Sequence, residues 1–389
     1  MMIMNKTIQL RLWAFLLTAS VAIGAMAQGS VRINKAVRLQ QVNGKSVLRA
    51  TDSRLPQTLA YFDHEEDVTS LPPEVYSFLA FYEEALRRID AGAAPEEVLS
   101  LDATATNATV GPLLGDIEFD QGTPYNDKCP YLNGGRAVTG CVATAMAQIM
   151  TYYRYPSVGT GTANYTGSSG ETTYKFAEHP FDWDHILHTY KNGGYTTVQA
   201  NAIAELMLAC GASVKMNYNY AGSGADSEKV TPALRDYFGY DPSIYSRQPE
   251  LSESKQYTIW TATLKREFEA GRPVYYSGGT QTDGHAFVLD GYMEEDGVVY
   301  FHVNWGWNGK YNGYFLLTGL KPDEGAGYSY RNHVVCNIFP KGAGVENIKE
   351  GEFRLDMNAP VYTILGTKIP AADMQHGFIY IQSGHKFVY

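Results

Sequence analysis

Residues 139–150 constrain the fold of this chain more than any other stretch, because a glycine–cysteine pair leads directly into a helical pattern. Apolar residues then recur at the spacing of one buried helix face, namely Val142, Ala145, Met146, Ile149, Met150 and Tyr153. Pro156 is expected to end this helix, since proline cannot donate the next hydrogen bond. The pattern therefore predicts that Cys141 lies at the first turn of a buried helix.

The first turn of a helix favours a reactive cysteine. Its unpaired backbone N–H groups concentrate positive potential, which stabilises a thiolate and lowers the pKa of the thiol. The same N–H groups could hold a developing oxyanion. The alternative is that Cys141 is a small buried residue packing the start of the helix, because cysteine thiols are often buried. Taken alone, the stretch supports both interpretations.

The first 27 residues have the pattern of a secretory signal. Lys6 and Arg11 precede an apolar run, which ends in the small-x-small sequence of residues 25–27. This run is too short and interrupted for a membrane span, and no other candidate span follows. Because residues 1–27 contain two cations and no acids, removing them would change the formal net charge from −10 to −12. An exported acidic chain without basic runs is a poor candidate for binding nucleic acid or anionic membranes.

Export makes disulfide bonds possible, so the four cysteines need to be considered together. Cys210 lies on the apolar face of a helical run, Cys336 lies in a strand-like run, and Cys129 precedes a proline in a loop. This spacing permits two bridges. A bridge at Cys141 would rule out a catalytic role for that thiol.

The region before the main domain carries its own pattern of elements. Alternation over residues 31–49, with a turn at 42–44, predicts a hairpin, and residues 75–89 form a helical stripe after two prolines. Small polar residues at 101–109 indicate an exposed linker. Residues 28–107, between a signal and a linker, suggest a pro-segment; an ordinary N-terminal subdomain fits the linker equally well.

The main domain is expected to span residues 108–340. The residue pattern of its first half predicts helices over 141–153, 198–210, 232–238 and 261–270, with a Gly/Tyr/Ser-rich loop region at 157–173. Its second half predicts strands over 273–276, 285–289, 298–304, 314–317 and 334–339. Helices followed by antiparallel strands indicate an α+β fold with two lobes. Residues 341–389 are expected to form a separate tail of short strands.

A catalytic thiol needs a base and a third group that orients the base. His285 is the best candidate base, because it follows Gly284 at the start of a strand pattern. It lies 144 residues after Cys141, which is within the range expected for a papain-like nucleophile and base. Asn304 could accept a hydrogen bond from the imidazole, and Trp305 could shield that bond from water. His302 is a rival base, since strand alternation puts it on the face of Asn304.

An amide upstream of the cysteine completes the candidate site. Gln121 precedes Cys141 by twenty residues. Its side-chain N–H could stabilise an oxyanion beside the backbone N–H of Cys141. The alternative is that Gln121 is an ordinary turn residue before Gly122.

Five segments together resemble the streptopain family of secreted bacterial papain-like cysteine peptidases. They are residues 121–126, 139–144, 147–150, 284–288 and 302–307, and the resemblance covers roughly residues 110–340 in the same order. It implies a two-lobed papain-like fold with a helical lobe and an antiparallel β lobe. It also implies that Cys141 is the nucleophile, His285 the general base and acid, and Gln121 the oxyanion donor.

The resemblance extends to residues around the catalytic pair. Asn304 and Trp305 match the segment that supports the histidine. The loop at 220–225 resembles the substrate-side loop of the family, which puts Gly224 and Gly284 at positions that bind the substrate backbone. The family also implies a zymogen whose pro-segment blocks or distorts the site, and a preference for a bulky hydrophobic residue two positions before the scissile bond.

These observations predict a secreted cysteine endopeptidase made as a proenzyme, acting on proteins or peptides through an acyl-enzyme and inhibited by its own pro-segment. No cofactor is expected beyond reducing conditions. A zinc site is conceivable because His179, His185 and His188 lie near Asp182 and Asp184, but their spacing lacks a tight set of ligands. The rival functions are a non-catalytic adhesin or haemagglutinin-like protein on the same fold, and a thiol acyl transferase.

Overall fold

The computed structural model describes the chain in several ranges. They are residues 30–67, 71–94, 107–132, 134–241, 243–247, 254–279, 284–317 and 330–341, with short pieces of the C-terminal region at 355–356, 359–363, 368–374, 379–382 and 385–388. The predicted signal at 1–27 and residues 101–106 of the predicted linker lie outside the described residues.

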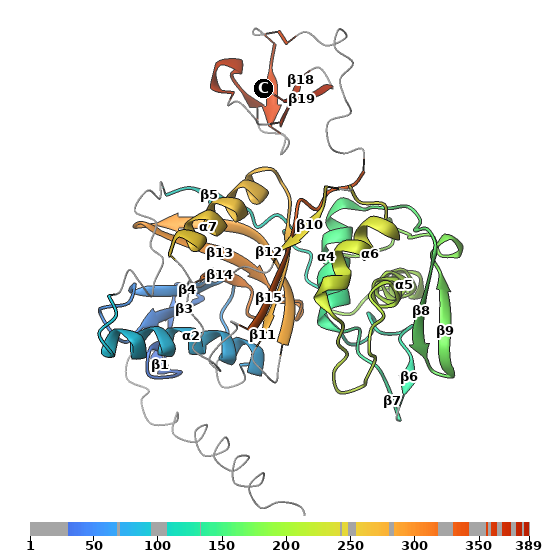
Figure 1. Ribbon diagram of the computed structural model, residues 1–389, viewed down its shortest axis with the longest axis horizontal. Helices are drawn as coiled ribbons and strands as arrows, with labels where there is room; N and C mark the ends of the chain where they lie inside the picture. The colour runs from blue at the N-terminus through green and yellow to red at the C-terminus, as the bar shows by residue number, and fades with distance from the viewer. Residues whose placement is uncertain are drawn as a thin grey trace, which may run out of the picture.

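One long antiparallel sheet runs through most of the described chain (Figure 1). Its strand order is β1-β2-β3-β4-β14-β13-β12-β11-β15-β10, and β5 pairs with β12. The bounds are β1 (Ser30–Arg32), β2 (Val37–Val42), β3 (Lys45–Ala50), β4 (Thr58–Phe62), β5 (Thr109–Val110), β10 (Tyr245–Arg247), β11 (Val274–Gly279), β12 (Gly284–Glu295), β13 (Val298–Asn304), β14 (Gly313–Leu316) and β15 (Tyr330–Cys336).

The N-terminal unit contains the predicted hairpin and helix. Asn43 and Gly44 turn between β2 and β3 with φ of 52° and 76°, the left-handed pair that suits a two-residue hairpin. Helix α2 (Pro73–Asp90) begins with a proline at its first position. Strand β4 pairs with β14, so this unit extends the sheet of the main domain instead of folding apart from it.

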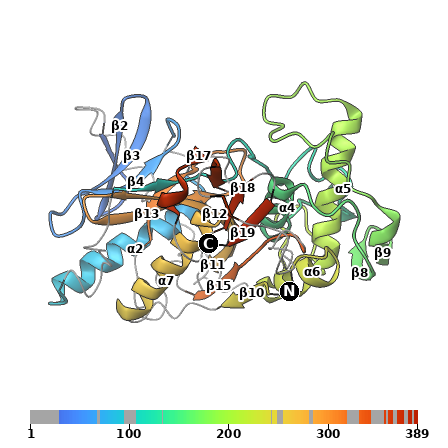
Figure 2. The same cartoon turned by 90° about the horizontal axis from the view of Figure 1, so that it is seen from above.

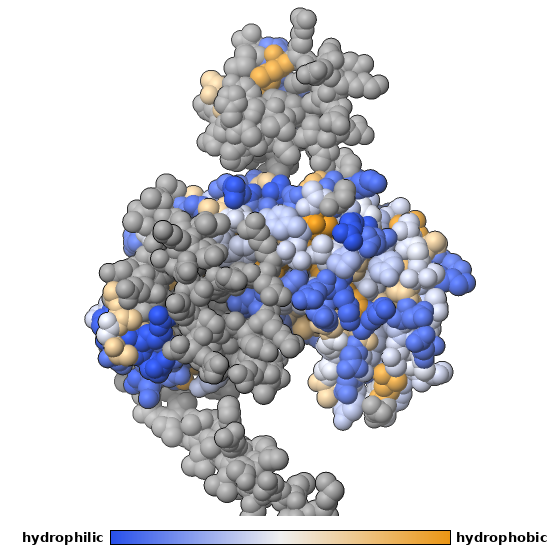
Figure 3. Space-filling view, viewed as in Figure 1, coloured by the Kyte–Doolittle hydropathy of each residue, from blue (hydrophilic) through white to orange (hydrophobic). Residues whose placement is uncertain are grey.

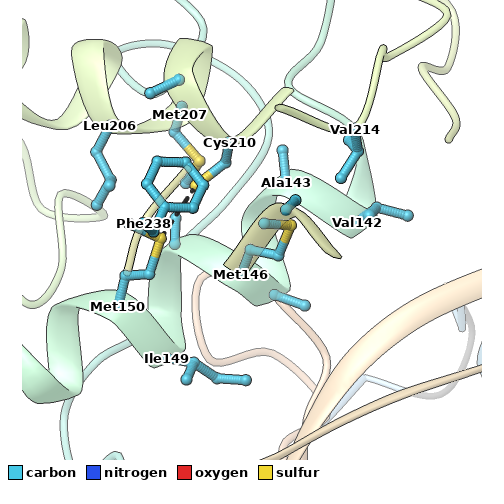
Figure 4. Packing of buried hydrophobic residues seen from close by; sticks show 14 of the residues in the cluster. Val142, Ala143, Met146, Ile149, Met150, Leu206, Met207, Cys210, Val214 and Phe238 are labelled. Atoms are coloured by element: carbon cyan, nitrogen blue, oxygen red, sulfur yellow. Dashed lines mark hydrogen bonds between the residues drawn. The ribbon is translucent and has the colours of Figure 1, made fainter. Parts of the chain in front are cut away.

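The helical lobe is built around α4 (Cys141–Tyr153), as the sequence predicted. The expected pattern was one buried face, but every residue from 142 to 151 is buried, because the sheet covers one side of α4 and α5 (Thr197–Ser213) the other. Figure 4 shows the contact with α5, where the Sγ of Cys210 lies 3.6 Å from the Sδ of Met150. Helix α6 (Val230–Asp236) completes the lobe.

Two predictions about loops are wrong. Residues 157–173 were expected to be a loop, but β8 (Thr162–Gly167) and β9 (Gly170–Lys175) pair there as a hairpin. Most of its residues are exposed, so the strands lack the apolar alternation that marks a half-buried sheet. The predicted linker was to run to residue 109, but β5 already pairs there with β12. A second small hairpin joins β6 (Tyr131–Leu132) and β7 (Gly135–Arg136).

Alternate residues of β12 face two different cores. Ala286 and Val288 pack with α4, whereas Phe287 and Leu289 pack with the aromatic core under α7 (Ser254–Glu269) and α2. Figure 2 shows α2 and α7 on the same side of the sheet, away from α4. The start of β12 therefore lies where the two lobes meet.

The C-terminal region forms its own four-stranded sheet in the order β17-β16-β18-β19. The strands are β16 (Val361–Thr363), β17 (Lys368–Ile369), β18 (Ile379–Gln382) and β19 (His385–Val388). A small cluster that includes Val361 and Tyr380 fills it. The expectation of a tail of short strands agrees with this sheet.

Hydrophilic residues dominate the described surface of the helical lobe in Figure 3, and hydrophobic residues gather there only in small patches. Within the part of the chain that the structure describes, none of the helices combines the length and hydropathy required to cross a bilayer.

Candidate active site

Cys141 is the first residue of α4 and is half-buried. Gly140 before it has a φ of +85°, and a Cβ there would lie 2.8 Å from the Sδ of Met216 and 2.9 Å from the carbonyl oxygen of Ser223. Only glycine fits this position without strain. Because Gly140 has no side chain to cap the helix, the N–H groups of the first turn can face a substrate oxyanion.

The disulfide question is settled in favour of a thiol at Cys141. All four cysteines are thiols in the structure. Burial raises the pKa of Cys129 to about 12 and also raises the pKa of Cys210, so these two thiols stay protonated. The condition that would have ruled out a catalytic cysteine is not met.

His285 lies at the start of β12 and is 5% exposed. Its Nε2 lies 2.8 Å from the carbonyl oxygen of Trp305, and its ring stacks on Trp307 at 4.5 Å between centroids. Since a carbonyl only accepts, Nε2 carries a proton and Nδ1 is the nitrogen that can take the thiol proton. Burial lowers the pKa of His285 to about 4, although the bond to Trp305 opposes this shift.

The expected hydrogen bond from the imidazole to Asn304 is wrong. The Nδ2 of Asn304 donates to the carbonyl oxygen of Ile117 at 2.8 Å, and its Oδ1 accepts from the N–H of Gly306 at 3.1 Å. The register explains the difference, because Asn304 pairs with Val288 and so shares the face opposite to that of His285. The backbone of the next residue holds the imidazole instead.

Trp305 is fully buried beside the histidine, at 6.1 Å between ring centroids. Its Nε1 donates to the carbonyl oxygen of Tyr311 at 2.9 Å, and its backbone N–H donates to Asn312 Oδ1 at 3.0 Å. Both ends of the tryptophan are therefore fixed, which fixes the carbonyl that holds the imidazole.

The rival base His302 is held by two carboxylates. Its Nδ1 lies 2.5 Å from Asp290 and its Nε2 lies 2.9 Å from Asp63. Burial opposes a charge there, but the two carboxylates outweigh it and raise the pKa of His302 to about 10. A histidine that is protonated on both nitrogens cannot accept the proton of Cys141.

Gln121 lies beside the segment that leads to Cys141. Its carbonyl oxygen accepts from the N–H of Thr139 at 3.1 Å, two residues before Cys141. Its own N–H lies 2.5 Å from a carboxylate oxygen of Asp120. The half-buried Gln121 is thus brought next to the start of α4.

The two glycines expected to bind the substrate backbone differ. The N–H and C=O of Gly224 already pair with Asn217, at 3.2 and 2.9 Å, so its expected role in binding the substrate backbone is not supported. Gly284 is exposed, pairs with Gly279 and directly precedes His285.

The possible zinc ligands are not gathered into one site. His185 pairs with Asp182 at 2.8 Å, and His188 pairs with Asp116 at 2.6 Å. No set of three potential ligands comes together anywhere in the described ranges.

Sequence reasoning missed two amides near the site. Gln148 on α4 is fully buried and accepts from the N–H of Phe119 at 3.1 Å. Asn308 has a φ of 55° and donates from its backbone to the carbonyl oxygen of Phe119 at 2.9 Å. A polar residue within an apolar helix pattern and an Asn-Gly pair were the available signals.

A cysteine at the start of a buried helix in a helical lobe, together with a histidine at the start of a strand in an antiparallel lobe, is the arrangement of papain-like cysteine peptidases. Residues 119–315 match the model of the peptidase C10 family, and the chain belongs to this family. It is a cysteine peptidase.

Two relatives illustrate the match in sequence. Streptopain from Streptococcus pyogenes is 33% identical over 343 residues, covering 78% of this chain and 82% of streptopain. The thiol protease/hemagglutinin PrtT from Porphyromonas gingivalis is 35% identical over 317 residues, covering 76% of this chain but 36% of PrtT. The resemblance to streptopain found in the motifs is confirmed.

Solved structures match the fold. A fragment of prointerpain A from Prevotella intermedia superimposes with a TM-score of 0.68 at 27% identity, covering 80% of this chain and 98% of the fragment. Active interpain A from the same organism gives a TM-score of 0.51 at 32% identity, covering 61% of this chain and 98% of interpain A. These matches confirm the two-lobed papain-like α+β fold.

Proposed function

We propose that this cysteine peptidase is an exported endopeptidase that hydrolyses proteins through Cys141 and His285. The observation that carries the proposal is the bond between His285 Nε2 and the carbonyl of Trp305, because it leaves Nδ1 to take the thiol proton. The thiolate attacks the peptide carbonyl, while the Gln121 side chain and the Cys141 N–H hold the oxyanion. His285 then protonates the leaving amine and activates the water that releases the acyl group.

The proposed substrate preference is a bulky hydrophobic residue two positions before the scissile bond. It is supported by the family resemblance. Gly284 would pair with the extended peptide backbone. A cleavage-site library should show enrichment at that position. Selection for arginine at the bond itself, with no enrichment two positions earlier, would contradict the preference.

We also propose that residues 28–107 are a pro-segment, that residues 108–340 are the peptidase domain, and that residues 341–389 are a C-terminal tail. Two carboxylates of the N-terminal unit reach the main domain. Asp63 binds His302, and Glu66 accepts from the N–H of Tyr311 at 2.8 Å. The carbonyl oxygen of Tyr311 also accepts a hydrogen bond from the Trp305 indole, so the N-terminal unit supports the loop that holds His285.

A thiol titration tests the function. Iodoacetamide near pH 6 should modify Cys141 fastest and abolish peptide hydrolysis in proportion to the label incorporated. The Cys141→Ala variant keeps the other three thiols and is the matched control; it should be inactive and label slowly. Peptide mapping that found Cys141 no faster than Cys129, Cys210 and Cys336 would reject the assignment.

The rivals give different results in the same assay. A non-catalytic binding protein would leave peptides intact. This alternative is suggested by PrtT, whose name describes a hemagglutinin as well as a thiol protease. An acyl transferase would yield a product whose mass shows addition to an acceptor other than water.

A further inference from the structure

The segment that carries Gln121 is tied to the rest of the site by three amide residues. Asn304 donates to the carbonyl oxygen of Ile117 at 2.8 Å. Gln148 accepts from the N–H of Phe119 at 3.1 Å, and the backbone N–H of Asn308 donates to the Phe119 carbonyl oxygen at 2.9 Å. The oxyanion segment is thus attached both to the nucleophile helix and to the loop that holds His285.

Asn308 makes one contact that the other two amides do not make. Its Nδ2 donates to one oxygen of the Asp120 carboxylate. The other Asp120 oxygen lies 2.5 Å from the N–H of Gln121. A chain of hydrogen bonds therefore runs from Asn308 through Asp120 to the backbone of Gln121.

The local backbone favours asparagine at this point. Asn308 has a φ of 55°, a left-handed conformation that asparagine and aspartate adopt more readily than most residues. Its Oδ1 also lies 3.5 Å from the hydroxyl of Tyr125. With its backbone bonded to Phe119 and its side chain between Tyr125 and Asp120, the amide has one orientation in which Nδ2 faces the carboxylate.

An oxyanion donor acts only when it is held close to its working position, since a displacement of about 1 Å costs up to about 100-fold in rate. The carboxylate of Asp120 can turn about its side-chain bonds unless a donor fixes its second oxygen. Asn308 supplies that donor.

We propose that Asn308 is a positioning residue for the oxyanion hole, orienting Asp120 so that the backbone of Gln121 is fixed beside Cys141. This inference rests on the proposed role of Gln121 as the oxyanion donor. It assigns Asn304 and Gln148 to holding earlier residues of the same segment and Asn308 to Gln121 itself.

The test replaces the donor without changing its size. Asn308→Asp keeps the shape and the left-handed conformation but turns an oxygen toward the Asp120 carboxylate. In the matured enzyme, kcat should fall between about 10-fold and 100-fold, with KM nearly unchanged. Alkylation of Cys141 should keep its original rate, because the altered chain of bonds ends at Gln121. A variant that loses alkylation as severely as kcat would contradict the proposal.

A reciprocal exchange separates positioning from a general loss of structure. In the double variant Asp120→Asn/Asn308→Asp, the new amide oxygen at position 120 can accept from the Gln121 N–H while its N–H₂ group donates to the new carboxylate at position 308. The donor and acceptor are exchanged and the chain of bonds is rebuilt, so kcat should return to within a few-fold of the original. Failure of the double variant to recover would overturn the proposal.

Gln121→Ala distinguishes this inference from the proposed function. If Gln121→Ala keeps its kcat, Gln121 is not the oxyanion donor and the proposed mechanism fails. If Gln121→Ala loses kcat while Asn308→Asp keeps it, only the role of Asn308 fails. If both single variants lose kcat, adding Asn308→Asp to Gln121→Ala should cause little further loss of kcat, because Asn308 acts through Gln121.

Discussion

His285 sits in surroundings that disfavour its own charge. The ring is buried and stacks on Trp307, and this burial lowers its pKa to about 4. An imidazolium at neutral pH therefore depends on a negative partner, which the proposed mechanism supplies as the Cys141 thiolate. The charged state belongs to the pair, so removing the thiol should return the histidine to its neutral form.

The titration of His285 can be followed directly in a Cys141→Ala variant by NMR of the imidazole. We expect its pKa near 4 in this background. Trp307→Ala should raise the value toward the ordinary 6.5, because loss of the stacked ring lets water reach the imidazole. Trp183→Ala is the matched control, since Trp183 donates to the carbonyl of Pro156 in the helical lobe, and should cause no shift. A titration at 6.5 in Cys141→Ala alone would contradict the burial argument.

At the scale of the element, the start of α4 depends on Gly140. An alanine there would have to adopt φ of 85° and ψ of 141°, a conformation essentially confined to glycine, at a cost of about 1–3 kcal/mol. Its Cβ would also meet Met216 and the backbone of Ser223, and such overpacking costs about 1–3 kcal/mol. We expect Gly140→Ala to lower the free energy of unfolding by about 2–6 kcal/mol, as measured by urea denaturation, and to slow alkylation of Cys141.

Gly222→Ala is the control for this substitution. Its Cβ would have no neighbour within 4 Å and its φ is not left-handed, so its effect on stability should be small. Equal destabilisation by the two variants would show that the close contacts at Gly140 do not matter.

Local patterns were sufficient to predict the elements that carry Cys141 and His285. The spacing from Val142 to Tyr153 fixed α4, although the helix ends at Arg154 in a left-handed conformation, before the proline expected to stop it. Polar, exposed strands such as β8 carry no such pattern. Their pairing depends on a turn and a partner strand, so the local pattern of residues 157–173 does not reveal the hairpin.

The contacts around Cys141 and His285 could not be predicted in this way. Asn304 was correctly placed on a strand near His285, but its face depends on a register that shifts between Leu289 and Gly291 of β12. Asn308 contacts Asp120 across 188 residues of sequence, and its Asn-Gly signal reports only a turn. Long-range register and amide bonds are properties of the packed molecule.

At the scale of the whole molecule, the N-terminal unit is part of the structure that surrounds the active site. Strand β4 covers the edge of β14, and residues of α2 share a core with Trp305. The hydroxyl of Tyr82 donates to the carbonyl of Leu316 at 2.7 Å. Release of this unit would expose the β14 edge and remove Asp63 from His302.

The ion pair between His302 and its two carboxylates should make the precursor sensitive to alkali. The native pKa of about 10 lies above the ordinary 6.5, so the native state holds this proton more tightly than the unfolded chain. The ion pair therefore contributes fully to the free energy of unfolding below pH 6.5, and this contribution is lost as the pH rises from 6.5 through 10. Urea unfolding of a full-length Cys141→Ala precursor should show this decline.

His302→Gln should flatten that decline between pH 6.5 and 10. His185→Gln is the control, because His185 pairs with Asp182 at an exposed site and should leave the decline unchanged. Identical pH profiles for His302→Gln and its parent would show that the buried ion pair does not contribute.

Maturation tests the proposed pro-segment as a whole. The full-length chain should be weakly active, and activity should rise as an N-terminal piece is lost. N-terminal sequencing should place the start of the active form between about residue 95 and 115, around the predicted linker of small polar residues. A fully active protein that begins at Gln28 would remove the pro-segment from the proposal.

Glu66 supplies the sharpest variant for this test. It accepts the N–H of Tyr311, whose carbonyl receives the Trp305 indole, so it acts on the loop that holds His285. Glu66→Ala leaves a buried N–H without its acceptor, at a cost of about 1–3 kcal/mol, and should shorten the lag before activation. Glu66→Gln keeps an acceptor oxygen and should retain most of the lag. If Glu66→Ala and Glu66→Gln mature at the original rate, the contact with Tyr311 does not hold the precursor together, and the strand pairing of β4 with β14 must do so alone.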